Sequence, residues 1–381
     1  MEKIIEKTQW NKRFSRIAQR VQPPEISWLM KQALEVPGLI SLAAGFVDQE
    51  SLPHHHVSPV LQEMLQEAQH GKISLQYGTT PGDADLRHHL VERLNKEGVL
   101  NPKAGIDASH LLVGSGSQQL LYLVAETLID ENDIILVEAP TYFVVLGAFK
   151  SRGARFYGID TDEHGMKTDH LREVLDQLKA DGQIHRVKML YLMSYSTNPT
   201  GITLKESRRK EVLEILHHHK EQGHPILLLE DGAYRRLHFA ESPPPTIKSM
   251  EEDNDMVLYT ESFSKSLAPG LRLGFGIGPK SIIDKMIDLK GNHDFGSSNF
   301  CQQLLKRLLS SPSFDEHTRT LKQVYREKCK LVLDILQETF PPEAKWVAPD
   351  GGFLAWIQLP KEWDTGPDGA LFKEAVDQKV L

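Results

Sequence analysis

The sequence is poor in cysteine. Its 381 residues include two, Cys301 and Cys329, and neither stands in a CxxC pair or near histidines at the spacing of zinc sites. A disulfide framework and a metal site are therefore not expected. The runs His54-His55-His56 and His217-His218-His219 do not change this view, because consecutive residues of a helix point in different directions. We expect both histidine runs to be solvated.

Long apolar runs and an excess of positive charge are also absent. The apolar runs reach about 8 to 10 residues, too short to span a membrane, and the first residues lack the apolar core of a secretion signal. With 44 basic and 52 acidic residues the net charge is −8. This balance argues against nonspecific nucleic-acid binding, although it leaves room for a local basic pocket for one small anion. We expect a cytoplasmic protein without membrane or nucleic-acid partners.

Between residues 110 and 280, short apolar runs alternate with amphipathic stretches of helical length. Most of the runs are almost continuously apolar, which is typical of strands covered on both faces. Strands that alternate with helices predict a mostly parallel sheet, so the expected fold class is α/β. The predicted strands are residues 110–116, 133–140, 187–195, 226–234, 256–263 and 271–278.

Both ends of the chain differ from this central region, and at about 150 residues per domain the length suggests two to three domains. The first 40 residues are polar and helix-like with a break at Pro23 and Pro24, residues 300–340 have a long helical pattern, and residues 345–360 resemble a hairpin that turns at Gly351 and Gly352. We predict a large domain of residues 51–290 and a smaller α+β domain formed by residues 1–50 and 291–381.

Polar residues follow the predicted strands, and in open α/β sheets ligands bind beyond the carboxyl ends of strands. The first strand leads through Gly114 and Gly116 into Ser117 and Gln118 at the start of a helix. Glycines allow close backbone approach, and the N–H groups of a first helical turn attract anions. The segment therefore predicts a phosphate site, although a serine N-cap after a tight turn explains it equally well.

The segment ESFSKSLAPGLRLG brings Ser262, Ser264, Lys265 and Arg272 within eleven residues. A lysine at the end of a buried strand loses charge by desolvation and becomes nucleophilic toward an aldehyde. The arginine and the hydroxyl groups offer donors to a phosphate. A surface lysine in a loop is the alternative, but it does not explain the cluster.

Three further strand ends suit an aromatic ring that carries a nitrogen and a phenolic oxygen. Asp231 would pair with a protonated ring nitrogen, because a carboxylate at the end of a buried strand needs a positive partner. Asn198 could donate to a phenolate, and Tyr142 could stack on the ring. The alternatives are a helix-capping aspartate, an Asn-Pro turn and core packing. A phosphate, an aldehyde, a ring nitrogen and a phenolate together describe pyridoxal 5′-phosphate (PLP).

The chain resembles the fold-type I aminotransferases of classes I and II, in particular their 2-aminoadipate, aromatic and broad-specificity branch. The resemblance implies a mostly parallel seven-stranded sheet with a smaller α+β domain, and PLP as the cofactor. It also implies transfer of an amino group from an L-amino acid to a 2-oxo acid, expected to be 2-oxoglutarate, by a ping-pong mechanism. It runs from about residue 37 to the end and is carried by LQYGTTPGDADLR, GSGSQQL, EAPTY, STNPTG, EDGAY, SFSKSLAPGLRLG and PDGGFLAW.

The resemblance also implies a role for each matching residue. Lys265 would form an aldimine with PLP and move the proton at the substrate Cα, and Asp231 would pair with the pyridine nitrogen. Asn198 and Tyr234 would hydrogen-bond the ring oxygen, and Tyr142 would stack on the ring. The phosphate would be held by Ser117, Gln118, Ser262, Ser264 and Arg272. Tyr77 would reach the phosphate in the neighbouring subunit of a homodimer, and Gly45 and Asn198 would lie beside the substrate carboxylate.

One departure from the family pattern is large. The family continues through a further strand to an arginine that binds the substrate α-carboxylate, whereas this sequence ends at FKEAVDQKVL and has no arginine in residues 361–381. We expect a truncated sequence in which amino-acid binding is weakened, because an arginine–carboxylate pair contributes a few kcal/mol. The alternative function is therefore a PLP-binding protein with impaired or non-transaminase activity.

Two further alternatives concern the N-terminal part. Related transcription regulators carry a DNA-binding domain before the aminotransferase part, but only about 36 residues precede the resemblance here, so a regulator is not favoured. Ser27 and Trp28 are candidates for the substrate pocket, and amphipathic packing explains them as well.

Overall fold

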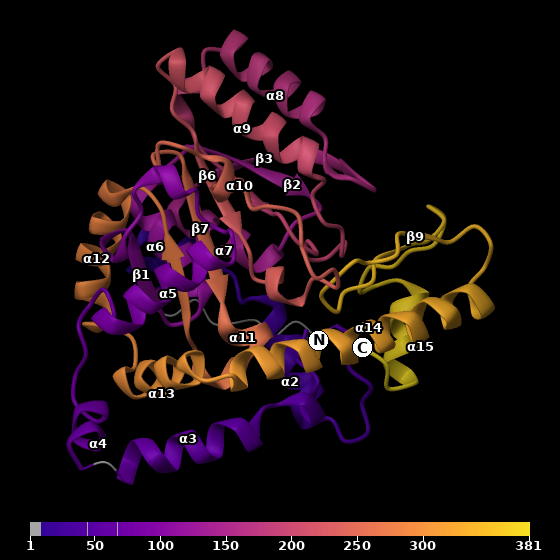
Figure 1. Cartoon of the computed structure of the whole chain (residues 1–381). Coiled ribbons are helices and arrows are strands. Elements are labelled where there is room, and N and C mark those ends of the chain that lie inside the picture. Colours follow the sequence, from indigo (N-terminus) through magenta and orange to yellow (C-terminus); the bar gives the residue numbers. More distant parts are fainter. Residues whose placement is uncertain (1–8, 44, 67) are drawn as a thin grey trace.

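The computed structural model describes residues 9–43, 45–66 and 68–381, so the first eight residues of the predicted N-terminal segment lie outside it. An eight-stranded sheet lies at the centre, with helices on both faces (Figure 1). Its strands are β1 Leu111–Gly114, β2 Ile134–Ala139, β3 Arg155–Asp162, β4 Gly165–Met166, β5 Val187–Met193, β6 Leu227–Asp231, β7 Val257–Ser262 and β8 Gly274–Ile277. All six predicted runs form strands, which confirms the α/β class. The sheet has eight strands rather than the expected seven, and the two-residue strand β4 lies at its edge beside the end of β3.

The order of the strands is β1-β8-β7-β6-β5-β2-β3-β4. Strands β3, β2, β5, β6 and β7 pair in parallel, whereas β8 is antiparallel to both β7 and β1. Ser262 at the end of β7 therefore pairs with Gly274 at the start of β8. The residues just before β8 consequently lie at the same edge as the carboxyl ends of the parallel strands.

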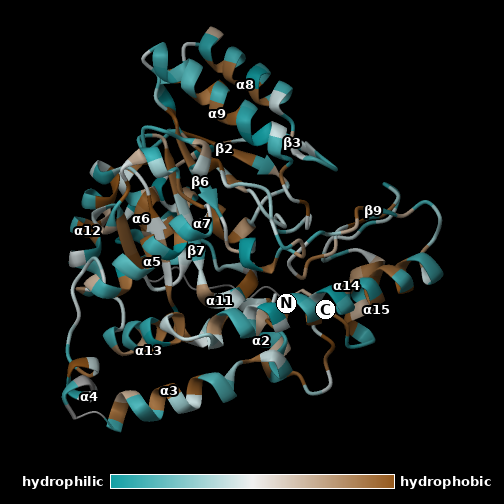
Figure 2. Ribbon diagram, in the orientation of Figure 1, coloured by the Kyte–Doolittle hydropathy of each residue, from teal (hydrophilic) through white to brown (hydrophobic). Residues whose placement is uncertain are grey.

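Side chains of successive strand residues point to opposite faces of the sheet. On β5, Tyr191 packs with α6 Ser117–Leu128, α7 Phe143–Arg152 and α12 Lys280–Asp294, whereas Leu190 packs with α8 Thr168–Ala180 and α9 Glu206–Glu221. The strands are the most hydrophobic part of the fold, and the outer helices α8 and α9 carry many hydrophilic residues (Figure 2). A third cluster joins β1 and β8 to α5 Ala84–Lys96 and α13 Asn299–Ser310.

Segments from both ends of the chain lie beside this sheet (Figure 1). The predicted hairpin is present as β9 Lys345–Trp346 paired with β10 Ile357–Gln358, and Ile40 forms a parallel bridge with Val380. The division at residues 50 and 290 stays a prediction. The other helices are α1 Arg16–Arg20, α2 Glu25–Glu35, α3 His54–Gln66, α4 Ala68–Ser74, α10 Ile247–Met250, α11 Phe263–Ser266, α14 Ser313–Thr339 and α15 Ala370–Asp377.

The structure also bears on the histidine runs. No helix in the described part of the chain has the length and apolar composition needed to cross a membrane. In the same part of the chain, no group of three or more histidine, cysteine, aspartate or glutamate residues is arranged to hold a metal ion. His54 and His55 are exposed. The expectation of a solvated second run is wrong for His219, which is 4% exposed. His219 lies three and four residues after Leu216 and Ile215, which is the spacing of one helix face, and all three are buried on the inner face of α9.

Candidate active site

The candidate site residues gather where β5, β6 and β7 end and β8 begins. Because β6 and β7 are neighbours and β8 adjoins β7, their terminal residues Asp231, Ser262 and Gly274 lie at one edge of the sheet. Asp231 and Ser262 share the face covered by α6 and α7, because each lies an even number of residues from Leu229 and Leu258, which pack on that face. The sequence prediction that the strand ends form one site is consistent with this topology.

Lys265 lies in α11, a short helix whose N-cap is Ser262, the side chain of which accepts a hydrogen bond from the Ser264 amide. Its Nζ donates a hydrogen bond of 2.9 Å to the Gly45 carbonyl oxygen and lies 5.2 Å from the centre of the Phe353 ring. Burial, and then the charge of Arg272, lower the pKa of Lys265 to about 8. An amine with this pKa is partly neutral near neutral pH, which is the form that attacks a carbonyl carbon.

An anion cradle lies beside this lysine. Helix α6 begins at Ser117 directly after Gly116, which has φ +78°. A Cβ atom at Gly116 would lie 3.0 Å from Arg272 Nη2, and one at Gly274 would lie 2.8 Å from the Ser117 amide nitrogen. The glycines thus let the helix N-terminus, the arginine and β8 approach closely. Gln118 adds a buried side-chain oxygen without a hydrogen-bond partner among the described residues.

The two serines of the SFSK segment have different neighbours. Ser262 Oγ accepts from the Ser264 amide at 3.1 Å and donates to Ser264 Oγ at 3.0 Å. Arg272, in the left-handed region at φ +50°, donates to Ser264 Oγ at 3.4 Å. Ser262 therefore starts the helix, whereas Ser264 lies next to the guanidinium group.

Asp231 is a buried carboxylate without a cationic partner in the described part of the chain. It is 2% exposed, and it accepts hydrogen bonds of 3.1 Å from the Tyr191 hydroxyl and from the Ala233 amide. Burial raises its pKa to about 6 despite these two hydrogen bonds. A cation placed against Asp231 would stabilise the carboxylate, and a protonated pyridine nitrogen is such a cation.

Two tyrosines line the same region. Burial, followed by the charge of the nearby Asp231, raises the pKa of Tyr142 to about 12. Tyr234 is 4% exposed and meets the Phe353 ring edge-on at a centroid distance of 5.4 Å. Burial raises the pKa of Tyr234 as well, while its hydrogen bond with Asn198 acts in the opposite direction. Both phenols therefore stay protonated donors at neutral pH.

Three predicted residues are not brought into this cluster within the chain. Tyr77 is 89% exposed, and Ser27 and Trp28 are exposed on α2. In contrast, Tyr191 and Phe353 are two contacts of the site that sequence reasoning missed. Phe353 directly follows the Gly351-Gly352 turn, which was a usable signal, whereas Tyr191 lies inside an apolar strand and gave none.

The chemistry of these residues fits PLP. A partly neutral lysine, an anion cradle and a buried acid without a cationic partner among the described residues lie at one edge of the sheet. These three groups match the aldehyde, the phosphate and the ring nitrogen of PLP. The orphaned Gln118 oxygen and the glycine close approaches show that the cradle is built for close contact.

Comparisons with known proteins agree with this chemistry. Residues 37–381 match the family model "Aminotransferase class I and II". The chain is 33% identical over 356 residues to aromatic-amino-acid aminotransferase 1 of Thermococcus litoralis, covering 93% of this chain and 82% of that relative. It is 32% identical over 373 residues to 2-aminoadipate transaminase of Thermus thermophilus, covering 97% of this chain and 87% of that relative.

A solved structure gives the same result for the fold. The kynurenine aminotransferase of Pyrococcus horikoshii, in complex with PMP, superposes with a TM-score of 0.89 at 31% identity, over 98% of this chain and 88% of that one. The family match spans nearly the whole chain, and the relatives are named aminotransferases. The chain therefore belongs to the class I and II aminotransferases, enzymes of PLP fold type I that depend on pyridoxal phosphate.

Proposed function

We propose that this enzyme transfers the amino group of an L-amino acid to a 2-oxo acid, with 2-oxoglutarate as acceptor, in a ping-pong sequence of two half-reactions. The observation that carries the proposal is Lys265, whose amine is partly neutral, held by the Gly45 carbonyl and placed beside the anion cradle. When bound, PLP supplies an electron-withdrawing ring that stabilises negative charge at the substrate Cα.

The residues of the chain would divide the remaining work. Arg272, Ser264 and the first turn of α6 would hold the phosphate through charge-assisted and backbone hydrogen bonds. Asp231 would stay ionised against the ring nitrogen and so keep that nitrogen protonated. Lys265 Nζ would carry the proton between the Cα and the cofactor, because its lowered pKa lets it both accept and release a proton near neutral pH.

Further contacts belong to the same proposal. Tyr142 would lie against the ring, Tyr234 and Asn198 would donate to its oxygen, and Asn198 and Gly45 would lie beside the substrate carboxylate. Ser117 and Gln118 would complete the phosphate contacts. Tyr77, which is 89% exposed, would reach the phosphate in the second subunit of a homodimer.

The names of the relatives suggest the donor class. The curated relatives are named for aromatic amino acids and for 2-aminoadipate, and the solved relative was crystallised with kynurenine. We propose that the donor has an aromatic or a long acidic side chain. The donor is tested by incubating the purified protein with PLP, 2-oxoglutarate and each ¹⁵N-labelled amino acid, and by following labelled glutamate with NMR.

Initial rates complete the test. A ping-pong sequence gives parallel double-reciprocal lines when donor and acceptor are varied, whereas a sequential mechanism gives intersecting lines. Lys265→Ala should abolish label transfer, and the exposed Lys330→Ala serves as matched control. Bound PLP without label transfer from any donor would overturn the proposal and favour a PLP-binding protein without transaminase activity.

A further inference from the structure

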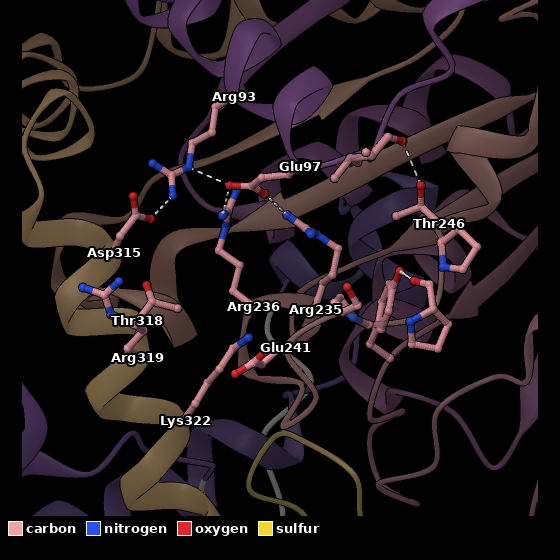
Figure 3. A pocket seen from close by; sticks show the side chains of 17 residues that line it. Arg93, Glu97, Arg235, Arg236, Glu241, Thr246, Asp315, Thr318, Arg319 and Lys322 are labelled. Atoms are coloured by element: carbon pink, nitrogen blue, oxygen red, sulfur yellow. Dashed lines mark hydrogen bonds and ion pairs between the residues drawn. The ribbon is translucent and has the colours of Figure 1, made fainter.

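A second cavity lies away from the candidate active site. It has a volume of about 520 Å³ and is bounded by the end of α5, the 3₁₀ turn Arg235–Leu237, the loop 241–246 and the first turns of α14 (Figure 3). None of the residues that line it belongs to the lysine site. It therefore needs an explanation of its own.

Strand alternation places this cavity behind the candidate active site. Ser262 faces the α6 and α7 side, so the preceding residue, Glu261, points to the opposite face. There Glu261 accepts hydrogen bonds from Arg235 and Arg236, which follow Tyr234 directly in the chain. The backbone that carries the lysine site on one side thus carries an arginine cluster on the other.

Glu97, which directly follows α5, joins this cluster. It accepts from Arg93 Nε at 2.7 Å and from Arg236 Nη1 at 2.7 Å, and it also pairs with Arg235. Burial alone would raise the pKa of Glu97, but Arg236 and Arg235 lower it to about 2. One ionised carboxylate is therefore shared by three arginines (Figure 3).

The carboxylates do not balance the positive charge. Five cationic side chains line the cavity against three carboxylates, Glu97, Glu241 and Asp315, and counting Glu261 behind them still leaves an excess of one positive charge. The ion pairs between the lining residues join Glu97 with Arg93, Arg235 and Arg236, and Asp315 with Arg93. None of the interactions drawn in Figure 3 involves Lys322 or Arg319, which project from α14. Burial, followed by Arg235 and Arg236, lowers the pKa of Lys322.

One hydrogen-bond donor of Arg236 is also unpaired among the described residues. Arg236 is 8% exposed, and its Nη2 has no hydrogen-bond acceptor among the residues that the structure describes. Because this nitrogen is itself buried, it adds positive charge to the wall of the cavity rather than a direct contact. The guanidinium and ammonium groups that reach the cavity bind phosphate and carboxylate oxygens strongly. An oxyanion in the cavity would meet Lys322 and Arg319 on one wall and the arginine cluster on the other.

We propose that this cavity is a binding site for a small oxyanion of the phosphate or carboxylate type, separate from the site for the cofactor and substrate. Cationic side chains from α5, the 3₁₀ turn and α14 line one cavity, and the carboxylates that line it do not neutralise their positive charge. The proposal does not rest on aminotransferase activity, because every residue that carries it lies outside the lysine site.

Calorimetric titration tests this proposal. Inorganic phosphate is titrated into the PLP-loaded protein, in which the cofactor's own phosphate fills the α6 cradle, and succinate is titrated separately. Lys322→Gln and Arg319→Gln each remove a cation without opening the buried arginine cluster. Lys330→Gln makes the same charge change on the exposed side of α14. The unfolding temperature of each variant without anion shows that it is folded.

We expect saturable binding of at least one of the two anions. Each cavity variant should weaken it by about tenfold, because a hydrogen bond between charged groups contributes about 1.5 kcal/mol or more, whereas Lys330→Gln should change it less than twofold. Phosphate binding without succinate binding identifies a phosphate site, and the reverse identifies a carboxylate site. No saturable binding of either anion below about 10 mM, or equal losses in Lys330→Gln and Lys322→Gln, would overturn the proposal.

Discussion

Replacing Lys265 by methionine should stabilise the cofactor-free protein at neutral pH. The folded environment lowers the pKa of this amine from the ordinary value of 10.5 to about 8. The folded chain therefore binds the Lys265 proton less tightly than the unfolded chain does, and holding the ammonium group in the fold at pH 7 costs about 3 kcal/mol. Methionine has a similar length and no charge, so this cost disappears in Lys265→Met.

Two lost contacts reduce the gain. The hydrogen bond from Lys265 Nζ to the Gly45 carbonyl contributes about 1 kcal/mol, and the ammonium group near the Phe353 ring contributes about 0.5–1 kcal/mol. The net expectation is an increase of about 1–2 kcal/mol in the free energy of unfolding at pH 7. The lowered pKa of Lys265 destabilises the folded parent protein by its full amount below pH 8. This destabilisation disappears as the pH rises from 8 to 10.5, because the amine then loses its proton in the unfolded chain as well.

Urea unfolding of the PLP-free protein at pH 7 and pH 10 measures this difference. At pH 10 the charge penalty falls to about 1 kcal/mol, so Lys265→Met should then be no more stable than the parent. Lys330→Met, an exposed lysine on α14, should stay within about 0.5 kcal/mol of the parent at both pH values. A Lys265→Met protein that is less stable at pH 7, or a difference that does not change with pH, would refute the reasoning.

Three further tests address other parts of the site. Asp231→Asn should weaken PLP binding by about 10- to 100-fold in an equilibrium dialysis assay, because the amide cannot pair with a charged ring nitrogen; unchanged affinity would contradict this role. Gly274→Ala should lower the free energy of unfolding by about 1–3 kcal/mol in urea, because its Cβ would lie 2.8 Å from the Ser117 amide nitrogen; a neutral effect would show that this approach is not tight. Tyr77→Ala and Lys265→Ala should each be inactive alone but recover activity when unfolded and refolded together, since a mixed dimer contains one intact site; no recovery would argue against a shared site.

Much of the candidate site could be predicted because the chemistry sits at strand ends. Lys265 and Asp231 each directly follow or end an apolar run, so the sequence places them at the sheet edge without knowledge of packing. The antiparallel β8 could not be read from its pattern, although it is what brings Arg272 to that edge. Strand β3 was missed because only Ile159 among its residues is fully buried, so its run is not continuously apolar.

The remaining features depend on distant parts of the chain. The ion cluster of Glu97 with Arg235 and Arg236 joins residues that are more than a hundred positions apart, and no local spacing predicts it. Tyr191 was hidden for a different reason, since a tyrosine in an apolar strand is usually core. His219 was misjudged because three histidines were considered as one group, whereas burial on a helix follows the helical period.

The half-reaction tests the central claim most directly. The PLP-loaded protein, free of 2-oxo acid, is mixed with single amino acids while the visible absorbance of the bound cofactor is recorded. We predict that at least one aromatic or long acidic amino acid converts the cofactor to its amine form, that 2-oxoglutarate restores the original spectrum, and that Lys265→Ala does neither. A bound cofactor whose spectrum is unchanged by every amino acid would contradict the account.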